Sequence, residues 1–93
     1  MYVLIRVDGD DSSGSSSIRM MAASGSLAEV KEMMRSEYEN ERVHPSSPWL
    51  DAWDDEYCFI DDMNAACETE WLEYVAEWFI FDTEDMAGFD LAI

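Results

Sequence analysis

Carboxylates are the most abundant chemically active side chains in this 93-residue chain, and they are unevenly distributed. Residues 43–93 contain fourteen Asp or Glu side chains and no Lys or Arg, whereas all five cationic side chains lie within residues 1–42. The fourteen acids are Asp51, Asp54, Asp55, Glu56, Asp61, Asp62, Glu68, Glu70, Glu73, Glu77, Asp82, Glu84, Asp85 and Asp90. A dense array of carboxylates attracts basic proteins and accelerates their encounter. The second half of the chain is therefore the candidate interaction surface.

Large aromatic residues alternate with these acids. Most of them should be core, because a domain this small must bury nearly every large side chain. Trp49 and Trp53 fall outside the expected regular elements and are flanked by acids, and tryptophan is enriched at protein interfaces. We therefore expect Trp49 and Trp53 to be exposed anchors of a partner-binding surface. The carboxylates expected beside them are Asp51, Asp54, Asp55, Glu56, Asp61, Asp62, Glu68, Glu70, Glu73 and Glu77.

The sequence offers few residues that are suited to catalysis. His44 is the only histidine and precedes Pro45 in an expected loop. A general base or an activated nucleophile needs an orienting partner within hydrogen-bond reach, and no Ser-His-Asp or Cys-His pattern can be placed. The four glycines are scattered and form no phosphate-binding loop or dinucleotide fingerprint. We expect a non-enzymatic protein without a cofactor.

Metal-binding patterns are incomplete. Cys58, Cys67 and His44 are too irregularly spaced for a zinc site. Residues 8–11 begin like a calcium loop, but Ser16 and Ser17 stand where the closing glutamate belongs. We expect no specific metal site, although a cation-responsive protein remains a third hypothesis for function. A bridge between the two cysteines also stays open, with free, half-buried thiols favoured.

The net charge of −17 excludes several classes of protein. Five cations cannot form a basic face for direct nucleic-acid binding, and anionic lipid surfaces would repel the chain. Hydrophobic residues make up 48% of the chain, which is too many for a disordered coil. No stretch approaches the roughly 18 apolar residues of a membrane span, and residues 1–8 lack the basic start of a signal peptide. Together with the low cysteine content, these features predict a cytosolic protein.

The spacing of the acids suits an imitation of nucleic acid. Duplex DNA carries one charge per about 1.7 Å of its axis. Carboxylates at alternate residues of a strand repeat about every 6.6 Å, and those at i and i+4 of a helix repeat about every 6 Å. Holding so many like charges together costs stability through self-repulsion. Two interpretations stay open on these grounds: a decoy for a phosphate-binding groove, and a surface that only confers solubility.

The run of acids and aromatics from Trp49 to Asp90, including Asp54-Asp55-Glu56, Asp61-Asp62 and Glu68 to Glu77, resembles a known family. It is similar to the small acidic DNA-mimic inhibitors of phages and mobile elements, which block CRISPR effectors or restriction enzymes. The resemblance is one of size and charge over about half the chain, without a diagnostic motif. It implies an anti-CRISPR protein in the cytoplasm of a bacterial host cell, which occupies the basic DNA channel or the PAM-reading site of an effector. It implies no catalytic residue.

The elements that must position these residues follow from local patterns. Residues 2–23 predict a hairpin, with a Gly/Ser-rich connector between two β-rich runs. Ser26 and Glu29 form a capping box ahead of a helix over residues 27–40, where Leu27, Val30, Met34 and Tyr38 share one face. Glu32, Arg35, Glu39 and Glu41 fall mostly on its solvent side.

The second half is less regular. Residues 44–62 predict an irregular acidic excursion, in which 48–55 suggest a short helix started by Pro48, and 56–60 a short strand or an ordered loop. Residues 63–82 fit either a helix or a hairpin. The hairpin, with strands over 63–68 and 75–82, is favoured because the run Trp78 to Phe81 is too continuously aromatic for a surface helix.

These patterns predict one acidic α+β domain over residues 1–93, with one main helix on a small antiparallel sheet of two hairpins. The leading hypothesis is an inhibitor that mimics DNA charge and binds a CRISPR effector, as a monomer or weak homodimer. The alternative is an acidic adaptor or neutralising partner of a basic protein without DNA mimicry.

Overall fold

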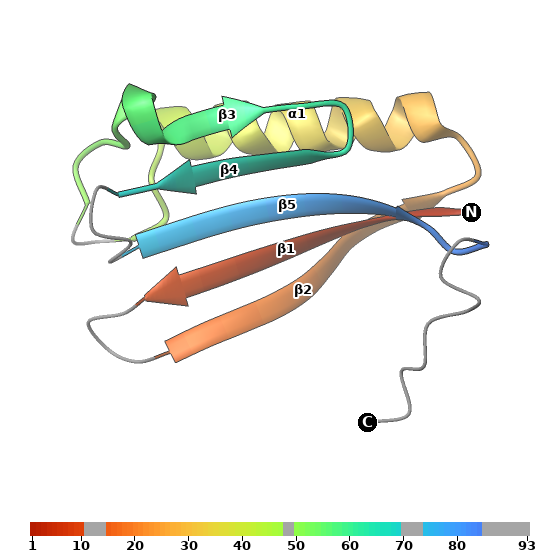
Figure 1. Ribbon diagram of the computed structural model, residues 1–93, viewed down its shortest axis with the longest axis horizontal. Coiled ribbons are helices and arrows are strands. Elements are labelled where there is room, and N and C mark those ends of the chain that lie inside the picture. Colours follow the sequence, from red (N-terminus) through yellow and green to blue (C-terminus); the bar gives the residue numbers. More distant parts are fainter. Residues whose placement is uncertain (11–14, 48–49, 70–73, 85–93) are drawn as a thin grey trace.

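The computed structural model describes residues 1–10, 15–47, 50–69 and 74–84. Within them the chain forms one five-stranded antiparallel sheet and one main helix, which is the α+β fold that the sequence predicts. The strand order across the sheet is β2-β1-β5-β4-β3 (Figure 1). The strands are β1 (Tyr2–Asp10), β2 (Ser15–Ser24), β3 (Cys58–Ile60), β4 (Asn64–Glu68) and β5 (Tyr74–Asp82).

The first hairpin is confirmed, and its first strand lies inside the sheet, between β2 and the central strand β5. β1 pairs with β2 along one side and with β5 along the other over its full length, from Tyr2 opposite Asp82 to Asp10 opposite Tyr74. The register with β2 shifts between Leu4 and Ile5. β1 therefore joins the two hairpins into one sheet.

The second hairpin is also confirmed, and the helical alternative for residues 63–82 is wrong. In β5, buried Ala76, Trp78 and Ile80 alternate with half-buried residues, as expected for a strand with one face on the core. β4 pairs with β5, and β3 adds a fifth strand beyond β4. The residues between Thr69 and Tyr74 lie outside the described part of the chain.

Helix α1 (Leu27–Val43) begins where predicted and ends three residues later than predicted. The Ser26 hydroxyl accepts a hydrogen bond from the Glu29 amide at 3.3 Å, as a capping box requires. In a capping box the Glu29 carboxylate would also accept from the Ser26 amide. Here that carboxylate accepts from the Ser24 hydroxyl, and the Ser26 amide donates to the same hydroxyl. Ser24 therefore ties the end of β2 to the first turn of the helix.

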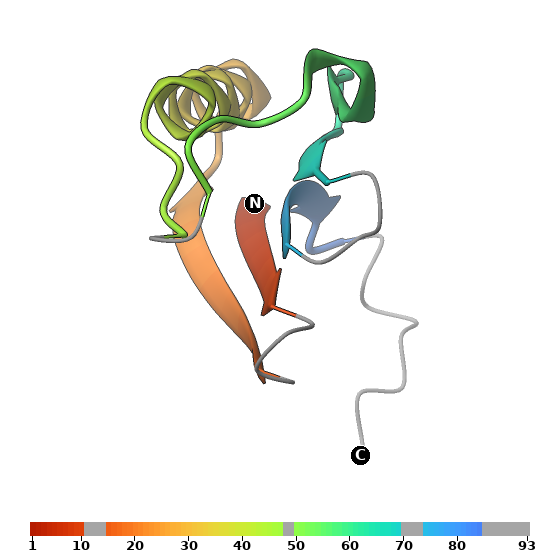
Figure 2. The ribbon, with the colours of Figure 1, turned by 90° about the vertical axis from the view of Figure 1, so that its left-hand side faces the viewer.

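The core lies between α1 and one face of the sheet. Figure 2 shows the helix beside the inner side of the curved sheet. Val30, Met34 and Tyr38 of the predicted helix face are buried, and Tyr38 stacks on Trp78 with ring centroids 6.1 Å apart. Leu4 and Ile80 complete the contact from the sheet. The opposite face of the sheet carries no helix within the described residues.

The excursion over 44–62 is more ordered than predicted. The short helix expected over 48–55 is wrong for its described part, since Leu50–Asp54 are not helical. A single 3₁₀ turn, η1 (Asp55–Tyr57), follows instead and leads directly into β3. The Asp54 carboxylate caps this turn by accepting from the Glu56 amide at 3.0 Å. A carboxylate at a turn start satisfies a backbone donor, which places the turn after Asp54.

Candidate acidic interaction surface

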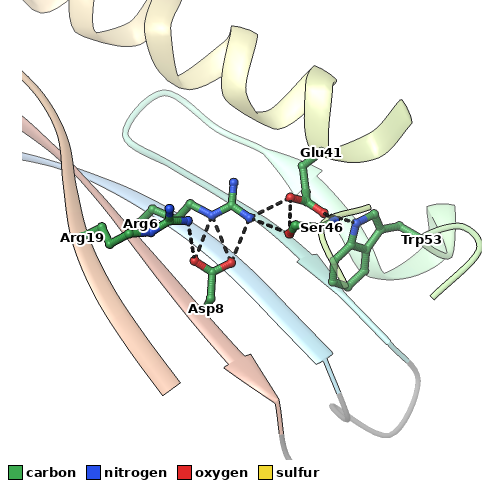
Figure 3. A network of polar contacts seen from close by, with 6 residues as sticks. All are labelled: Arg6, Asp8, Arg19, Glu41, Ser46 and Trp53. Carbon is green, nitrogen blue, oxygen red and sulfur yellow. Dashed lines mark hydrogen bonds and ion pairs between the residues drawn. The ribbon is translucent and has the colours of Figure 1, made fainter. Parts of the chain in front are cut away.

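A buried ion pair connects the sheet to the end of the helix. Arg6 of β1 donates from Nη2 to Glu41 Oε1 of α1 at 2.6 Å, and both side chains are almost fully buried (Figure 3). The Arg6 guanidinium also lies over the Trp78 ring, 4.9 Å from its centroid. Charges are buried in proteins when they are paired and hydrogen-bonded, and both conditions hold here.

The prediction that Glu41 lies on the solvent side of the helix is wrong, because its side chain is in the core. The position of Glu41 in the sequence indicates that its side chain is buried. Glu41 follows Tyr38 by three residues and Met34 by seven, so it lies on the apolar face. Arg6 is two residues from Leu4 in β1, so both side chains lie on the face that the helix covers. Polar residues on an apolar face indicate a buried polar network.

The position of Trp53 contradicts the prediction that its side chain is exposed. It is only 7% exposed, and its indole N–H donates to Glu41 Oε2 at 2.9 Å. Trp53 is therefore a core residue, and the expectation that it is an exposed interface anchor is wrong. The cause is the buried carboxylate, which gives the indole nitrogen a partner inside the protein. Trp49 lies outside the described residues.

Ser46 completes the network around Glu41. Its amide donates to Glu41 Oε2 at 2.7 Å, and its hydroxyl donates to Glu41 Oε1 at 2.8 Å. Burial alone would raise the pKa of Glu41, but the hydrogen bonds from Arg6, Ser46 and Trp53 outweigh it and lower that pKa. Burial would likewise lower the pKa of Arg6, and its contacts with Asp8 and Glu41 raise it instead. Both groups are held in their charged forms.

The network reaches the surface through Asp8. Its carboxylate accepts from Arg6 Nη2 at 2.8 Å and from Arg19 Nη2 of β2 at 3.1 Å (Figure 3). A pocket of about 370 Å³ opens beside this end of the network, and its lining includes Asp8, Arg19, Ser46 and Trp53. Each of these side chains already has a partner within the network, so they serve to join β1, β2 and the segment after α1.

The network positions the acidic segment that follows Trp53. With Trp53 held against Glu41, Asp54 leaves the core and caps η1, and the Tyr57 amide donates to the Asp54 carbonyl oxygen at 3.0 Å. Beyond β3, the Asp61 amide donates to the Asn64 carbonyl oxygen at 2.7 Å and closes the turn into β4. Five exposed carboxylates are thereby placed before and after the outermost strand, β3, and exposed Asp51 lies two residues before Trp53. We call this set the acidic edge: Asp51, Asp54, Asp55, Glu56, Asp61 and Asp62.

The fold brings cations beside the acidic edge, although the sequence separates them. Lys31 Nζ lies 3.9 Å from Asp62 Oδ1, and Arg42 pairs with Asp55. Arg35, on the same side of α1, lines an open pocket together with Asp61 and Asp62. Three of the six carboxylates thus lie beside three cations, and the edge keeps a negative balance. The surface expected from the second half of the chain therefore also includes cations from α1.

Glu68 and Glu77 belong to a different surface from the acidic edge. Trp78 faces the helix, so its neighbour Glu77 points to the opposite face of the sheet, and Glu68 lies diagonally across from it on β4. Burial, followed by the charge of Glu68, raises the pKa of Glu77. Glu70 and Glu73, also expected in the binding surface, lie outside the described residues.

Within the described residues, no cluster of three or more His, Cys, Asp or Glu side chains could hold a metal ion. No helix in this part of the chain is long and apolar enough to cross a membrane. Comparison of the chain with protein-family models, with curated proteins and with solved structures finds no match in any of the three.

Proposed function

We propose that this protein is a non-enzymatic inhibitor whose acidic edge occupies the DNA-binding channel of a basic nucleoprotein effector. A CRISPR effector is the class that the resemblance in size and charge favours. The proposal depends on one observation above all. Six exposed carboxylates lie on either side of β3 within residues 51–62, and turns and strand pairing hold the segment after Trp53, in a molecule with a net charge of −17.

The carboxylates of the acidic edge remain available to a partner. In the pairs with Lys31 and Arg42, the Asp62 and Asp55 side chains are still 93% and 87% exposed. Exposed ion pairs of this kind contribute only about 0–1 kcal/mol. A lysine or arginine of a partner can join or replace the intramolecular cation at little cost.

The edge also has an extent that suits a phosphate-binding channel. Lys31 and Arg42, which mark its two ends, are separated by eleven residues of α1, or roughly 16 Å along the helix axis. Over that length a DNA strand presents successive phosphates at about 3.4 Å per step. A carboxylate group at each end can therefore meet Lys or Arg side chains that otherwise contact phosphates several steps apart.

The first experiment identifies the partner and tests competition. The protein is used to capture effectors from lysates that express a panel of CRISPR effectors, and the captured complexes are challenged with duplex DNA that carries the cognate PAM. Release by DNA is the expected result. Capture that DNA does not reverse would place the binding site outside the DNA channel, and no capture by any effector would contradict the proposal.

The second experiment locates the binding surface. The variant Asp54→Asn/Glu56→Gln/Asp61→Asn removes three charges from the acidic edge and keeps the capping oxygen of residue 54. Exposed charge pairs contribute up to about 1 kcal/mol each, so we expect affinity for the effector to fall roughly 10- to 100-fold. The matched control is Glu32→Gln/Glu39→Gln/Glu84→Gln, which removes three exposed charges elsewhere. Equal losses in both variants would show that net charge matters and the acidic edge does not.

A second candidate function is an acidic partner of a basic protein that binds through apolar contacts. It is favoured by the sheet face opposite the helix, where Ile18 and Met20 of β2 are 73% and 69% exposed and Phe59 of β3 is also exposed. Ile18→Ser/Met20→Ser would then weaken binding more than the triple change in the acidic edge, and DNA would not compete. Trp53→Ala cannot serve as this test, because Trp53 is part of the core.

A further inference from the structure

Cys58 and Cys67 are directly opposite each other in the sheet. Cys58 opens β3, and the register of β3 and β4 pairs it with Cys67. Both cysteines are free thiols in the structure. The sequence, in which they are nine residues apart, does not by itself place them together.

The hydrogen-bond pattern shows which kind of pair this is. The Asp61 amide bonds to the carbonyl oxygen of its opposite residue, Asn64, so Asp61 and Asn64 form a hydrogen-bonded pair. Such pairs alternate with non-hydrogen-bonded ones along an antiparallel ladder. Counting back three positions makes Cys58 and Cys67 a non-hydrogen-bonded pair. The Cα atoms of these pairs are about 4.5 Å apart, which lies within the range of about 4.4–6.8 Å that disulfides span.

The two thiols also point to the same side and interact. Opposite residues of a ladder share a face, and a side-chain hydrogen bond joins Cys67 to Cys58. Cys58 is half-buried, whereas Cys67 has no exposed surface. A small reagent from solvent therefore reaches Cys58 first.

The surroundings assign different roles to the two sulfurs. Burial, and then the charge and hydrogen bond of Cys58, raise the pKa of Cys67 well above its usual value, so Cys67 stays a thiol. Arg42 is close enough to interact electrostatically with both sulfurs. The positive charge of Arg42 opposes the rise in the pKa of Cys67 but does not outweigh burial and Cys58.

We propose that Cys58 and Cys67 form an oxidation site at which hydrogen peroxide converts the two thiols into an intramolecular disulfide. The Cys58 thiolate attacks one peroxide oxygen, the O–O bond breaks, and the departing hydroxide takes up the proton that the Cys58 thiol released, giving water. The sulfenic acid left on Cys58 is then attacked by the Cys67 sulfur. The S–O bond breaks, and the hydroxide leaves as a second water with the proton of Cys67. Two thiols are oxidised by two electrons, and hydrogen peroxide is reduced to two waters.

The disulfide would fasten the outermost strand of the sheet. β3 has three residues and a partner strand on one side only, and it lies between Asp54–Glu56 and Asp61–Asp62. A covalent link to β4 at Cys58 would limit separation of β3 from the sheet, and so would hold both acid groups in place. The oxidation itself does not depend on the proposed function.

The test treats the full-length folded protein with hydrogen peroxide and then alkylates the remaining thiols after denaturation. We expect the intact mass to fall by two hydrogen atoms, both thiols to resist alkylation, and dithiothreitol to restore them. The chain should stay monomeric on a non-reducing gel, and its melting temperature should rise. Two alkylated thiols after treatment, or a disulfide-linked dimer, would overturn the proposal.

Single-cysteine variants test the roles of the two sulfurs. In Cys67→Ser, peroxide should produce a sulfenic acid on Cys58 that dimedone traps. In Cys58→Ser, the buried Cys67 should remain a thiol under the same treatment. The variant Arg42→Gln should form the disulfide several-fold more slowly. Faster oxidation of Cys67 than of Cys58 would contradict the assignment, whether or not the protein binds an effector.

Discussion

At the scale of single residues, Glu41 is the shared acceptor of the buried polar network. It is 2% exposed and accepts hydrogen bonds from Arg6, Ser46 and Trp53, which come from three separate parts of the chain. Removing one partner of a buried ion pair leaves the other uncompensated, which costs about 3–5 kcal/mol. We therefore expect Glu41→Ala to lower the free energy of unfolding by that amount in urea titrations. The exposed neighbour Glu39→Ala is the control and should change it by about 0.5 kcal/mol or less; similar losses would contradict the account.

The same carboxylate predicts a dependence on pH. Because folding lowers the pKa of Glu41, its contribution is complete above the ordinary glutamate value of about 4.3 and is lost as pH falls through the lower, folded value. The difference in stability between wild type and Glu41→Gln should therefore be large at pH 7 and shrink below about pH 4. Melting temperatures of both proteins from neutral to acid pH measure it, and a constant difference would exclude this origin.

Glu77 should behave in the opposite way. Its pKa is raised in the folded protein, so ionisation at neutral pH opposes folding and protonation favours it. We expect Glu77→Gln to raise the melting temperature at pH 7 and to lose this advantage as pH falls from the raised, folded pKa of Glu77 to the ordinary glutamate value of about 4.3. Glu84→Gln, at an exposed site, is the control. A Glu77→Gln variant less stable than wild type at pH 7 would show that the carboxylate has a favourable partner.

At the scale of elements, the buried network determines how firmly η1 is held. Trp53→Phe keeps an aromatic ring in the core and removes the N–H that donates to Glu41. We expect faster amide hydrogen exchange at Glu56 and Tyr57, whose amides bond to Asp54, with unchanged protection at Met34 in the middle of α1. Uniformly faster exchange in all elements would mean that Trp53 stabilises the whole fold and has no local effect on η1.

The elements also show what the sequence can and cannot predict. The first hairpin, the start of α1 and the second hairpin follow from local signals: a Ser/Gly-rich connector, a capping serine and the continuously aromatic run from Trp78 to Phe81. The pairing of β1 with β5 joins residues more than sixty positions apart, and no local pattern encodes it. The buried contact of Arg6 with Glu41 spans 35 positions, so each charge resembles a surface residue until the fold brings them together.

The candidate site could also be predicted from the sequence only in part. The exposed acids before and after β3 lie at the surface, as runs of charge usually do. Their separation from Glu68 and Glu77 depends on strand alternation, which requires the register to be known. The burial of Trp53 depends on Glu41, a partner twelve residues away on another element.

At the scale of the whole molecule, a net charge of −17 makes the account testable through ionic strength. Salt screens exposed charges over about 10 Å at 0.1 M, so attraction between the acidic edge and a basic channel must weaken as salt is added. Apolar association through the opposite face of the sheet would depend on salt far less.

The most direct measurement is the affinity of the protein for a captured effector at about 50 mM and about 500 mM salt, for wild type and for Asp54→Asn/Glu56→Gln/Asp61→Asn. We predict that the affinity of the wild type falls at least tenfold across this range, and that the variant binds more weakly and depends less on salt. An affinity that salt leaves unchanged, or an equal dependence in both proteins, would contradict binding through the acidic edge.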